Sequence, residues 1–376
     1  MSRRRLILVG GGHAHLFVLE AFARAPLDGL EIELVSPVRL APYSGMMPGV
    51  IAGHYRYEQG CVDLAPLARA CGAAWRETRA VALDPRQRLV FCEDGSDLAG
   101  DAISIDSGST PGRFGVAGVE EHAHPVKPIE RFVTGWESLF FRLHERSAPR
   151  IAVVGAGAAG CELIMAMHHR LDTLNLRAAR CTLISDAPTI LPGFPAGVRR
   201  RIRSCFDAKG IAVRTGSPAA RIEPKRVVLA DGGAVEADFV VWATGSSPPE
   251  WPRASGLACD ARGFIRVDRH LQSTSHPGIF AAGDVASMDG EPRPKSGVYA
   301  VRAGPPLAAN LRAALEGRPL APYRPQRRAL ALIGTGGTHA VGLWGPFSWQ
   351  GRWVWTWKDR IDRAFVARFT EGYASA

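Results

Sequence analysis

The sequence has no apolar run that approaches the roughly 20 residues that a membrane-spanning helix needs. The basic opening, residues 1–5, and the apolar residues 6–9 superficially resemble a signal peptide. The apolar stretch is too short for one, however, and it continues into glycines instead of a cleavage site. We therefore expect a cytoplasmic protein, with peripheral contact to the inner face of the cytoplasmic membrane as an open alternative.

Closely spaced cysteine pairs are also missing. Seven cysteines are scattered along the 376 residues without C-x-x-C spacing, which argues against a zinc site and against a redox disulfide between near neighbours. Cys161 follows a glycine turn, where a helix dipole can lower the pKa of a thiol. A small packing residue is nevertheless the better interpretation of it. We expect no metal.

Lysine is scarce, with five residues among 46 basic ones, so arginine supplies most of the net charge of +10. Such a balance suits nucleic acid, an anionic membrane or an acidic ligand. The sequence contains no nucleic-acid recognition module, and we expect no nucleic acid as a partner. A hydrophobic content of 46% and a charged content of 22% are typical of a soluble globular protein. The length fits two domains with a modest extension.

Two glycine-rich turns each follow a short apolar strand. Residues 6–9 lead into Gly10, Gly11 and Gly12, and residues 151–154 lead into Gly155, Gly157 and Gly160. The first glycine permits a tight turn, and the second lets a pyrophosphate approach the amides that begin the next helix. Two such turns in one chain predict two dinucleotides, and therefore electron transfer between them.

The hydrophobic pattern predicts an α/β fold with two Rossmann-like domains and a C-terminal α+β segment. Strand, glycine turn, helix and strand alternate over residues 5–36, and again from residue 151 to residue 185. A loop is expected over residues 37–53. Further helices are expected over residues 129–145, 195–209 and 297–315. The predicted domains are an FAD domain in two segments (1–112 and 246–325), an NAD(P) domain (113–245) and the C-terminal segment (326–376).

These motifs resemble the pyridine nucleotide–disulfide oxidoreductase superfamily. The resemblance rests on the two glycine turns, on Ala243-Thr244-Gly245 at a strand end and on residues 279–284. Residues 118–127 and a tryptophan-rich tail resemble type II NADH dehydrogenases and sulfide:quinone oxidoreductases. Residues 42–49 and 355–363 resemble the flavoprotein module found alone or fused ahead of selenide, water dikinase. The resemblance implies hydride transfer from NADH to FAD and onward to an acceptor, and a functional link to that dikinase.

The resemblance also implies which residues surround FAD. Lys295, Lys127 and Tyr43 are the candidates for catalytic residues near the flavin. Two departures stand out, because His15 replaces the third glycine and Ser36 replaces an acid that often binds the adenosine ribose. The histidines at positions 13 and 15 do not share a helix face, so hydrogen bonding or packing suits them better than zinc. The implied FAD residues are Gly10, Gly12, His13, Ala14, Ser36, Pro42, Ser109, Gly283, Asp284 and Val298.

The second turn is expected to bind the nicotinamide dinucleotide. No arginine or lysine follows the strand that ends at Ser185, and Asp186 would repel a 2′-phosphate, so NADH is preferred to NADPH. The implied residues are Gly155, Gly157, Ala158, Gly160, Glu162, Ser185, Asp186 and Gly245.

The acceptor is the open question. Residues 43–47 contain no cysteine, which argues against disulfide reduction. Val298, Arg302 and Ala303 stand where quinone-using relatives often carry glutamines, which weakens quinone reduction. We expect a small-molecule acceptor. A membrane-associated NADH:quinone or sulfide:quinone-type enzyme and a flavin-bound accessory protein of selenium metabolism with little turnover are the alternatives.

The tail, residues 351–370, predicts an amphipathic helix. Its aromatic and aliphatic residues recur at i, i+4 spacing with basic residues interleaved, as in helices that lie in a membrane interface. The same pattern suits a helix packed on the protein's own core or across a homodimer, and both interpretations stay open. The apolar residues are Trp353, Trp357, Ile361, Phe365 and Phe369; the basic ones are Lys358, Arg360, Arg363 and Arg368.

Overall fold

The first half of the molecule is built on a five-stranded parallel sheet. The computed structural model describes residues 3–112, 114–143 and 148–373. The strand order is β21-β9-β1-β2-β5, and every neighbouring pair is parallel. Because β21 comes from late in the chain, two separated segments build this sheet. The strands are β1 (Arg4–Val9), β2 (Leu30–Val35), β5 (Ala73–Arg76), β9 (Ala102–Ile105) and β21 (Ile279–Ala281).

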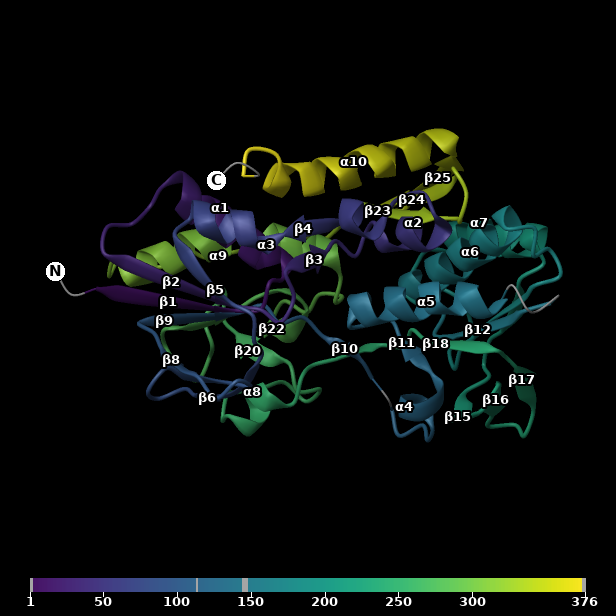
Figure 1. The fold of residues 1–376 in the computed structure, drawn as a ribbon, viewed down its shortest axis with the longest axis horizontal. Helices are drawn as coiled ribbons and strands as arrows, with labels where there is room; N and C mark the ends of the chain where they lie inside the picture. The colour runs from purple at the N-terminus through teal and green to yellow at the C-terminus, as the bar shows by residue number, and fades with distance from the viewer. Residues whose placement is uncertain (1–2, 113, 144–147, 374–376) are drawn as a thin grey trace.

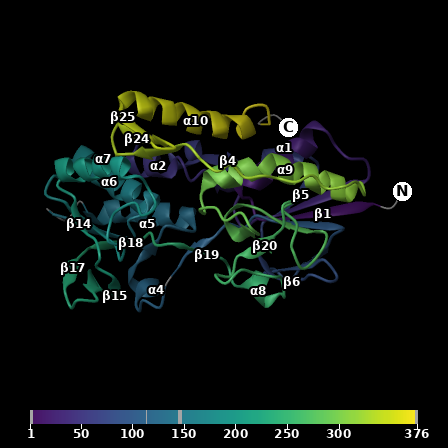
Figure 2. The same cartoon turned by 180° about the vertical axis from the view of Figure 1, so that it is seen from behind.

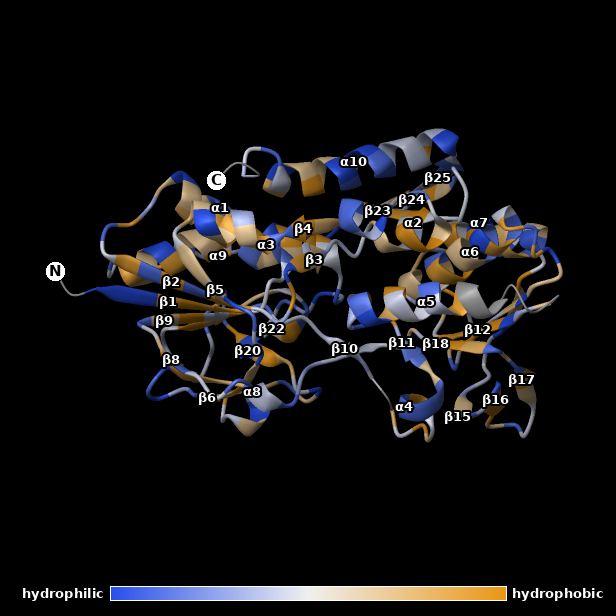
Figure 3. Cartoon of the chain, viewed as in Figure 1, coloured by the Kyte–Doolittle hydropathy of each residue, from blue (hydrophilic) through white to orange (hydrophobic). Residues whose placement is uncertain are grey.

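The second half repeats this plan with the order β11-β18-β12-β13-β14, again with every pair parallel. Strands of a parallel sheet are covered on both faces and are therefore continuously apolar, as the orange colour of β12 and β18 shows (Figure 3). The structure confirms the predicted α/β class with two Rossmann-like units. The strands are β11 (His124–Pro125), β12 (Arg150–Val154), β13 (Arg180–Ile184), β14 (Ala212–Arg214) and β18 (Phe239–Trp242).

Helices cover both sheets. In the first half α1 (His13–Arg24) and α9 (Gly297–Leu315) pack against each other, and α9 lies on the side of the sheet seen in Figure 2. In the second half α6 (Ala158–Thr173) follows β12 as α1 follows β1. The other helices are α3 (Leu64–Ala70), α4 (Val119–His122), α5 (Ile129–Leu143), α7 (Ala196–Lys209), α8 (Trp251–Ala254), η1 (Tyr57–Gly60) and η2 (Gly283–Val285).

Smaller sheets decorate each half. Two three-stranded antiparallel sheets lie at equivalent places, β6-β7-β8 in the first half and β15-β16-β17 in the second, and the pair β10-β19 forms where the chain crosses between the halves. These strands are β3 (Leu40–Pro42), β4 (Cys61–Asp63), β6 (Ala80–Asp84), β7 (Leu89–Cys92), β8 (Asp97–Ala99), β10 (Thr110–Pro111), β15 (Ala219–Glu223), β16 (Arg226–Leu229), β17 (Ala234–Glu236), β19 (Ser246–Ser247), β20 (Ile265–Val267) and β22 (Ala286–Met288).

The C-terminal segment forms the antiparallel sheet β23 (Ala331–Gly334), β24 (Ala340–Trp344) and β25 (Phe347–Gly351), followed by α10 (Arg352–Thr370). Figure 1 shows α10 lying along both halves. Residues four apart on a helix are rotated by about 40° beyond a full turn. The predicted stripe therefore winds around α10, so that Trp353 is 57% exposed and Phe369 is 1% exposed.

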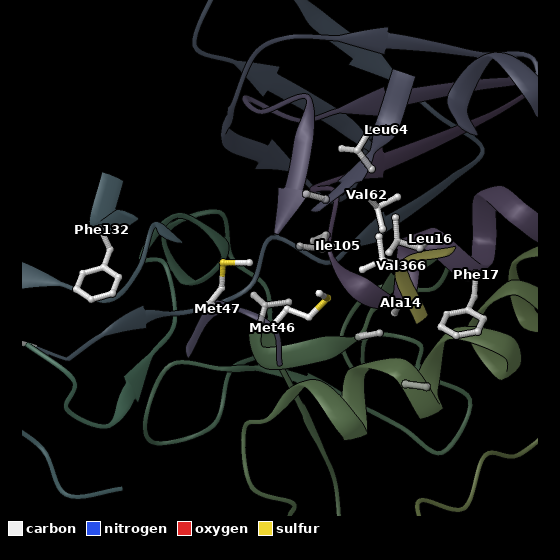
Figure 4. Close-up of a cluster of buried hydrophobic side chains, with 14 of the residues drawn as sticks. Ala14, Leu16, Phe17, Met46, Met47, Val62, Leu64, Ile105, Phe132 and Val366 are labelled. Atoms are coloured by element: carbon white, nitrogen blue, oxygen red, sulfur yellow. The ribbon is translucent and has the colours of Figure 1, made fainter. Parts of the chain in front are cut away.

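The C-terminal end of α10 belongs to the hydrophobic core around the first sheet. Figure 4 shows Val366 of α10 among Leu16, Val62 and Ile105, together with Met46 and Met47 at the start of α2 (Met47–Ala52). Phe369 also packs edge-to-face against Phe17, with ring centres 5.0 Å apart. Among the described residues, no helix is long and apolar enough to cross a membrane.

Two local expectations were wrong. The predicted loop over residues 37–53 contains the helix α2 (Met47–Ala52), which packs on α6 of the other half. Pro48 is compatible with the first turn of a helix, because that turn needs no amide from it, and Gly53 ends α2 with a φ of 86°. The sequence also predicts one short strand near residues 74–83, but the structure divides this segment into β5 and β6.

Candidate functional site

The first glycine turn opens into the larger of the two cavities that surround the first sheet's strand ends. Gly10 leaves β1 with a φ of +96°, and a side chain there would overlap the backbone of Asp106. The helix α1 then begins at His13 with Gly12 as its N-cap. The cavity has a volume of about 380 Å³. It runs from the end of β2 past the glycine turn to the start of α9, an elongated shape that suits an extended dinucleotide.

Eight of the thirteen residues assigned to FAD and the flavin surroundings line this cavity. They come from the turn after β1, the end of β2, β3, the loop after β9, the segment before α5, and η2. The eight are Gly10, Gly12, His13, Ser36, Pro42, Ser109, Lys127 and Asp284.

Asp284 anchors the middle of the cavity. Its Oδ2 accepts a hydrogen bond from the Lys127 ammonium at 2.8 Å and one from the Ser109 hydroxyl at 3.2 Å. Although burial opposes ionisation, Lys127 and Ser109 lower the pKa of Asp284 below its ordinary value. Among the described residues both bonds end on Oδ2, which leaves Oδ1 available for a hydroxyl group of a ligand.

Asp106 is a cavity residue that the sequence analysis missed. It follows β9 directly, and its Oδ2 accepts hydrogen bonds from the amides of Ala14 at 2.8 Å and His15 at 3.3 Å. Burial raises the pKa of Asp106 to about 6, against the effects of His13 and of these two amides. Burial lowers the pKa of His13. The signal in the sequence is a carboxylate directly after an apolar strand, at a position where the backbone of the second unit places Ala243.

The structure explains both residues that depart from the family pattern in the first unit, His15 and Ser36. The His15 ring is fully buried, with Nδ1 2.6 Å from the Gly10 carbonyl oxygen and Nε2 2.8 Å from the Ser104 hydroxyl. Burial lowers the pKa of His15 to about 4, so its imidazole is neutral. Ser36 donates its hydroxyl to the Val38 carbonyl at 3.0 Å and lines the cavity at the end of β2.

Tyr43 lies beside the cavity and contacts α10. Its ring stacks on Phe365 at 4.2 Å and meets His13 edge-on at 5.4 Å, and its hydroxyl is hydrogen-bonded to Asp362. Ala14 uses its amide to bind Asp106. Val298 is the second residue of α9 and follows a cavity residue, Gly297.

Lys295 lines a second cavity, of about 250 Å³, which includes Gly283 and shares Asp284 and Ala300 with the first cavity. Its ammonium donates to the Ala286 carbonyl and lies 4.0 Å from the centre of the Phe264 ring. Burial lowers the pKa of Lys295 to about 8. The structure thus separates Lys295 from Lys127, which lies in the first cavity.

The second glycine turn has the backbone that a pyrophosphate needs. Gly155 leaves β12 with a φ of +115°, and Gly157 caps α6, which starts at Ala158. A Cβ at Gly157 would meet no atom within 4 Å, whereas one at Gly160 would overlap the Gly155 carbonyl oxygen. The turn therefore leaves space at Gly157 for a ligand and requires Gly160 for the packing of α6 on β12.

The strand end beside this turn presents Ser185 and Asp186. Ser185 is buried and accepts the Ala187 amide at 3.2 Å, and Asp186 is exposed. The sheet brings Arg214 next to them, since the Ser185 amide bonds to its carbonyl, a neighbour that sequence distance concealed. Gly245 pairs through its carbonyl with the Gly112 amide at 2.7 Å, at the crossing between the halves.

Glu162 points away from the second turn, into a buried charged cluster. Its Oε1 accepts the Gly334 amide at 2.7 Å. Lys358 of α10 pairs with Asp362 at 2.6 Å and donates to the Gly45 carbonyl at 2.5 Å. Burial raises the pKa of Glu162 to about 7, although Lys358 opposes this. The cluster joins α6, the loop before α2 and α10, and so links all three parts of the chain.

The family comparison agrees with this geometry. The model of the pyridine nucleotide-disulphide oxidoreductase family matches residues 4–304, which span both glycine turns and Asp284. The chain belongs to that family. Membership makes it an oxidoreductase that uses a flavin and a pyridine nucleotide, as the sequence analysis predicted.

Several relatives of the chain are named NADH dehydrogenase-like proteins. The chain is 26% identical over 298 residues to an NADH dehydrogenase-like protein of Mycobacterium tuberculosis, covering 76% of this chain and 74% of the relative. An NADH dehydrogenase-like protein of Bacillus subtilis is 24% identical over 295 residues, covering 77% and 78%. The sulfide:quinone oxidoreductase of Aquifex aeolicus has the same fold, with a TM-score of 0.83, 20% identity and coverage of 99% and 94%.

Proposed function

We propose that the chain is an FAD-dependent NADH dehydrogenase that passes electrons to a small-molecule acceptor. The observation that carries the proposal is the pairing of two glycine turns of equal geometry with one elongated cavity that contains Asp284. The residues fit FAD: the turn before α1 can bind a pyrophosphate through its amides, and the Asp284 carboxylate can accept a ribityl hydroxyl. Bound FAD supplies hydride and electron transfer.

Groups of the protein that lie around the cavity stabilise negative charge in it. The N-terminus of α9 begins at Gly297 on the cavity wall, and the positive end of a helix dipole stabilises negative charge nearby. Lys127 balances the Asp284 carboxylate. Among the described residues no cysteine lines this cavity, and burial raises the pKa of Cys161 to about 12. These observations support an acceptor other than a disulfide.

We infer NADH as the donor from the charge beside the second turn. The exposed Asp186 carboxylate would repel a 2′-phosphate. Arg214 is the neighbouring group that could oppose this effect, because the sheet places it beside Ser185. A comparison of kcat/KM for NADH and NADPH tests the preference. Asp186→Asn is expected to narrow the difference, whereas Arg214→Gln is expected to widen it if that side chain attracts phosphate.

Anaerobic reduction tests the main proposal. The purified protein should be yellow, and its flavin band near ~450 nm should bleach on addition of NADH. A panel of quinones, selenium species and oxygen added to the reduced protein identifies the acceptor by the return of the band. Selenium species belong in the panel because of the resemblance of residues 42–49 and 355–363 to the selenide, water dikinase-associated module. A colourless protein, or a band that NADH leaves unchanged, contradicts the proposal.

We also propose that the N-terminal end of α10, with the two strands before it, contacts an anionic membrane surface. Seven large hydrophobic side chains are exposed among the described residues, and five of them lie between residues 344 and 361. Trp349 stacks with two of the three tryptophans of the helix, Trp353 at 6.4 Å and Trp357 at 6.3 Å between ring centres. Exposed Arg352 and Arg360 flank them, and such aromatic and basic groups favour anionic headgroups. The five are Trp344, Phe347, Trp353, Trp357 and Ile361.

Phe347 and Phe114 provide a matched test, because they are 69% and 66% exposed and only Phe347 lies in this patch. The full chain should co-sediment with anionic vesicles and be released at high salt. Phe347→Ser should weaken retention and Phe114→Ser should not. Absence of retention contradicts the proposal, and a doubled mass that Phe347→Ser halves would assign the patch to a homodimer instead.

A further inference from the structure

A buried carboxylate occupies the end of the helix at which the FAD pyrophosphate is expected. Asp106 is 3% exposed, and it lines the first cavity beside Gly12 and His13. Its Oδ2 binds the second and third amides of α1, those of Ala14 and His15. Amides at these positions make a helix N-terminus attractive to phosphate, and the His15 amide also bonds to the Gly12 carbonyl at 3.0 Å. An ionised Asp106 and a pyrophosphate would therefore place like charges at one helix end.

The second unit shows that the fold does not require this carboxylate. Asp106 follows β9 and bonds through its amide to the Val9 carbonyl at 2.8 Å. Ala243 follows β18 and bonds to the Val154 carbonyl at 2.8 Å. The two residues thus hold the same backbone position, and Ala243 has no side-chain group that could accept a helix amide. The carboxylate is a feature added to the first unit alone.

The charged form of Asp106 has little cationic support among the described residues that face it: His13 lowers the pKa of Asp106, but burial keeps the pKa of His13 itself below its ordinary value. From α1, His13 is buried and its pKa is lowered, and the His15 ring contacts Gly10 and Ser104 through its two nitrogens. From η2, Asp284 adds a second carboxylate, and Lys127 is already paired with Asp284 at 2.8 Å. Burial of a charge without a partner is costly, and protonation relieves that cost.

We propose that Asp106 takes up a proton from solvent when the FAD pyrophosphate binds, so that FAD affinity rises as pH falls. This inference rests on the proposed FAD site. Burial, which outweighs the effects of His13 and the two amides, raises the pKa of Asp106 to about 6, and a bound pyrophosphate would raise it further by repulsion. Between the pKa values of the free and bound forms, affinity increases by at most about tenfold for each unit of pH decrease. Below both values the affinity is constant.

The dissociation constant of FAD, measured by fluorescence on the deflavinated full chain between about pH 5.5 and 8.5, tests the proposal. Asp106→Asn keeps an oxygen for the Ala14 amide and removes the charge. Asp106→Ala copies the second unit. Both variants should bind FAD about tenfold more tightly than the wild type at about pH 8 and equally at about pH 5.5. Asp101→Asn is the control, since Asp101 binds the Arg5 amide at the opposite end of β9.

Calorimetry of the wild type gives a second readout that needs no variant to fold. Titration of FAD in two buffers of different ionisation enthalpy should show uptake of at most about half a proton, near about pH 6.5, if the effect on affinity is about tenfold. His13→Asn should retain this uptake and Asp106→Asn should abolish it. Binding without proton uptake, uptake that His13→Asn abolishes, or equal affinities of Asp106→Asn and wild type at high pH would each overturn the inference. Failure of every form to bind FAD would overturn the proposed function as well.

Discussion

Gly10 and Gly155 lie at equivalent points of the two parallel sheets. Each has a positive φ, +96° and +115°, and each donates its amide to the end of the neighbouring strand at 2.8 Å, to Val35 and to Ile184 respectively. The backbone of the turn is thus reproduced in the two units. The side chains around it are not. The comparison separates what the turn requires for folding from what each unit adds for its ligand.

The position of the third glycine shows how the two units differ in the packing of helix on turn. Gly160 in the second unit permits close contact of α6 with the turn, since any side chain would overlap the Gly155 carbonyl. His15 in the first unit fills the equivalent space with a ring that contacts the Gly10 carbonyl and the Ser104 hydroxyl. The turn and the following helix therefore pack in two ways. In the second unit a glycine lets the helix approach the turn, and in the first unit a buried imidazole with both nitrogens hydrogen-bonded fills the space.

The largest effect is expected from Gly160→Val. The added side chain would collide with backbone, which cannot move as a flexible side chain can, so destabilisation of about 3 kcal/mol or more is expected. Gly157→Val is the matched control, because a Cβ there meets no atom within 4 Å. Melting temperatures compare the two. Equal stability of the variants would show that the second unit tolerates a wider helix–strand spacing, as the first does.

Asp284→Ala should remove FAD from an otherwise folded protein. It deletes the carboxylate that holds Lys127 and that we expect to bind the ribityl chain, which we estimate weakens FAD binding by about 100-fold. Flavin content after purification, measured by absorbance, is the readout. Asp289→Ala is the control, because that carboxylate pairs with Arg266 at 2.6 Å on the surface. A full flavin content in Asp284→Ala would place the FAD site elsewhere.

Gly157→Val should leave FAD bound and prevent flavin reduction by NADH. The valine points into open space in the protein, where a pyrophosphate would approach the turn. Stopped-flow reduction should therefore be slowed by about 100-fold or more at subsaturating NADH. A reduction rate equal to that of the wild type at all NADH concentrations would show that the second turn does not bind the donor.

The sequence predicted the backbone of the two units better than their side-chain contacts. Short apolar strands and glycine turns are local signals, and α9 was predicted over 297–315 and occupies Gly297–Leu315. The helix α2 was missed because Pro48 and the flanking glycines are typical of a loop. The proximity of Lys358 to Glu162 depends on how α10 crosses both halves, which no local pattern contains. The proposed role of Asp106 rests on its comparison with Ala243, which lies more than 100 residues later in the chain.

His15→Gly, which gives the first unit the glycine of the second, should have the smallest effect. It removes the ring and leaves the Ser104 hydroxyl without this partner, at a cost of about 2 kcal/mol near neutral pH. FAD should still bind, because the cavity-lining residues remain. Urea midpoints measure the loss of stability, and His122→Gly, at an exposed histidine of α4, gives the baseline for a substitution by glycine.

The pH dependence of this loss tests whether His15 acts as a buried neutral ring. Burial lowers the pKa of His15 to about 4, while the unfolded chain keeps the ordinary value of about 6.5. Between these values the unfolded state binds the additional proton, so the wild type loses stability as pH falls from about 6.5 towards 4. His15→Gly lacks this contribution. The difference in stability between wild type and variant should therefore shrink between about pH 7 and pH 4.5. A difference that stays constant would mean that the imidazole is solvated or already charged, and that the first turn owes its shape to something other than the buried ring.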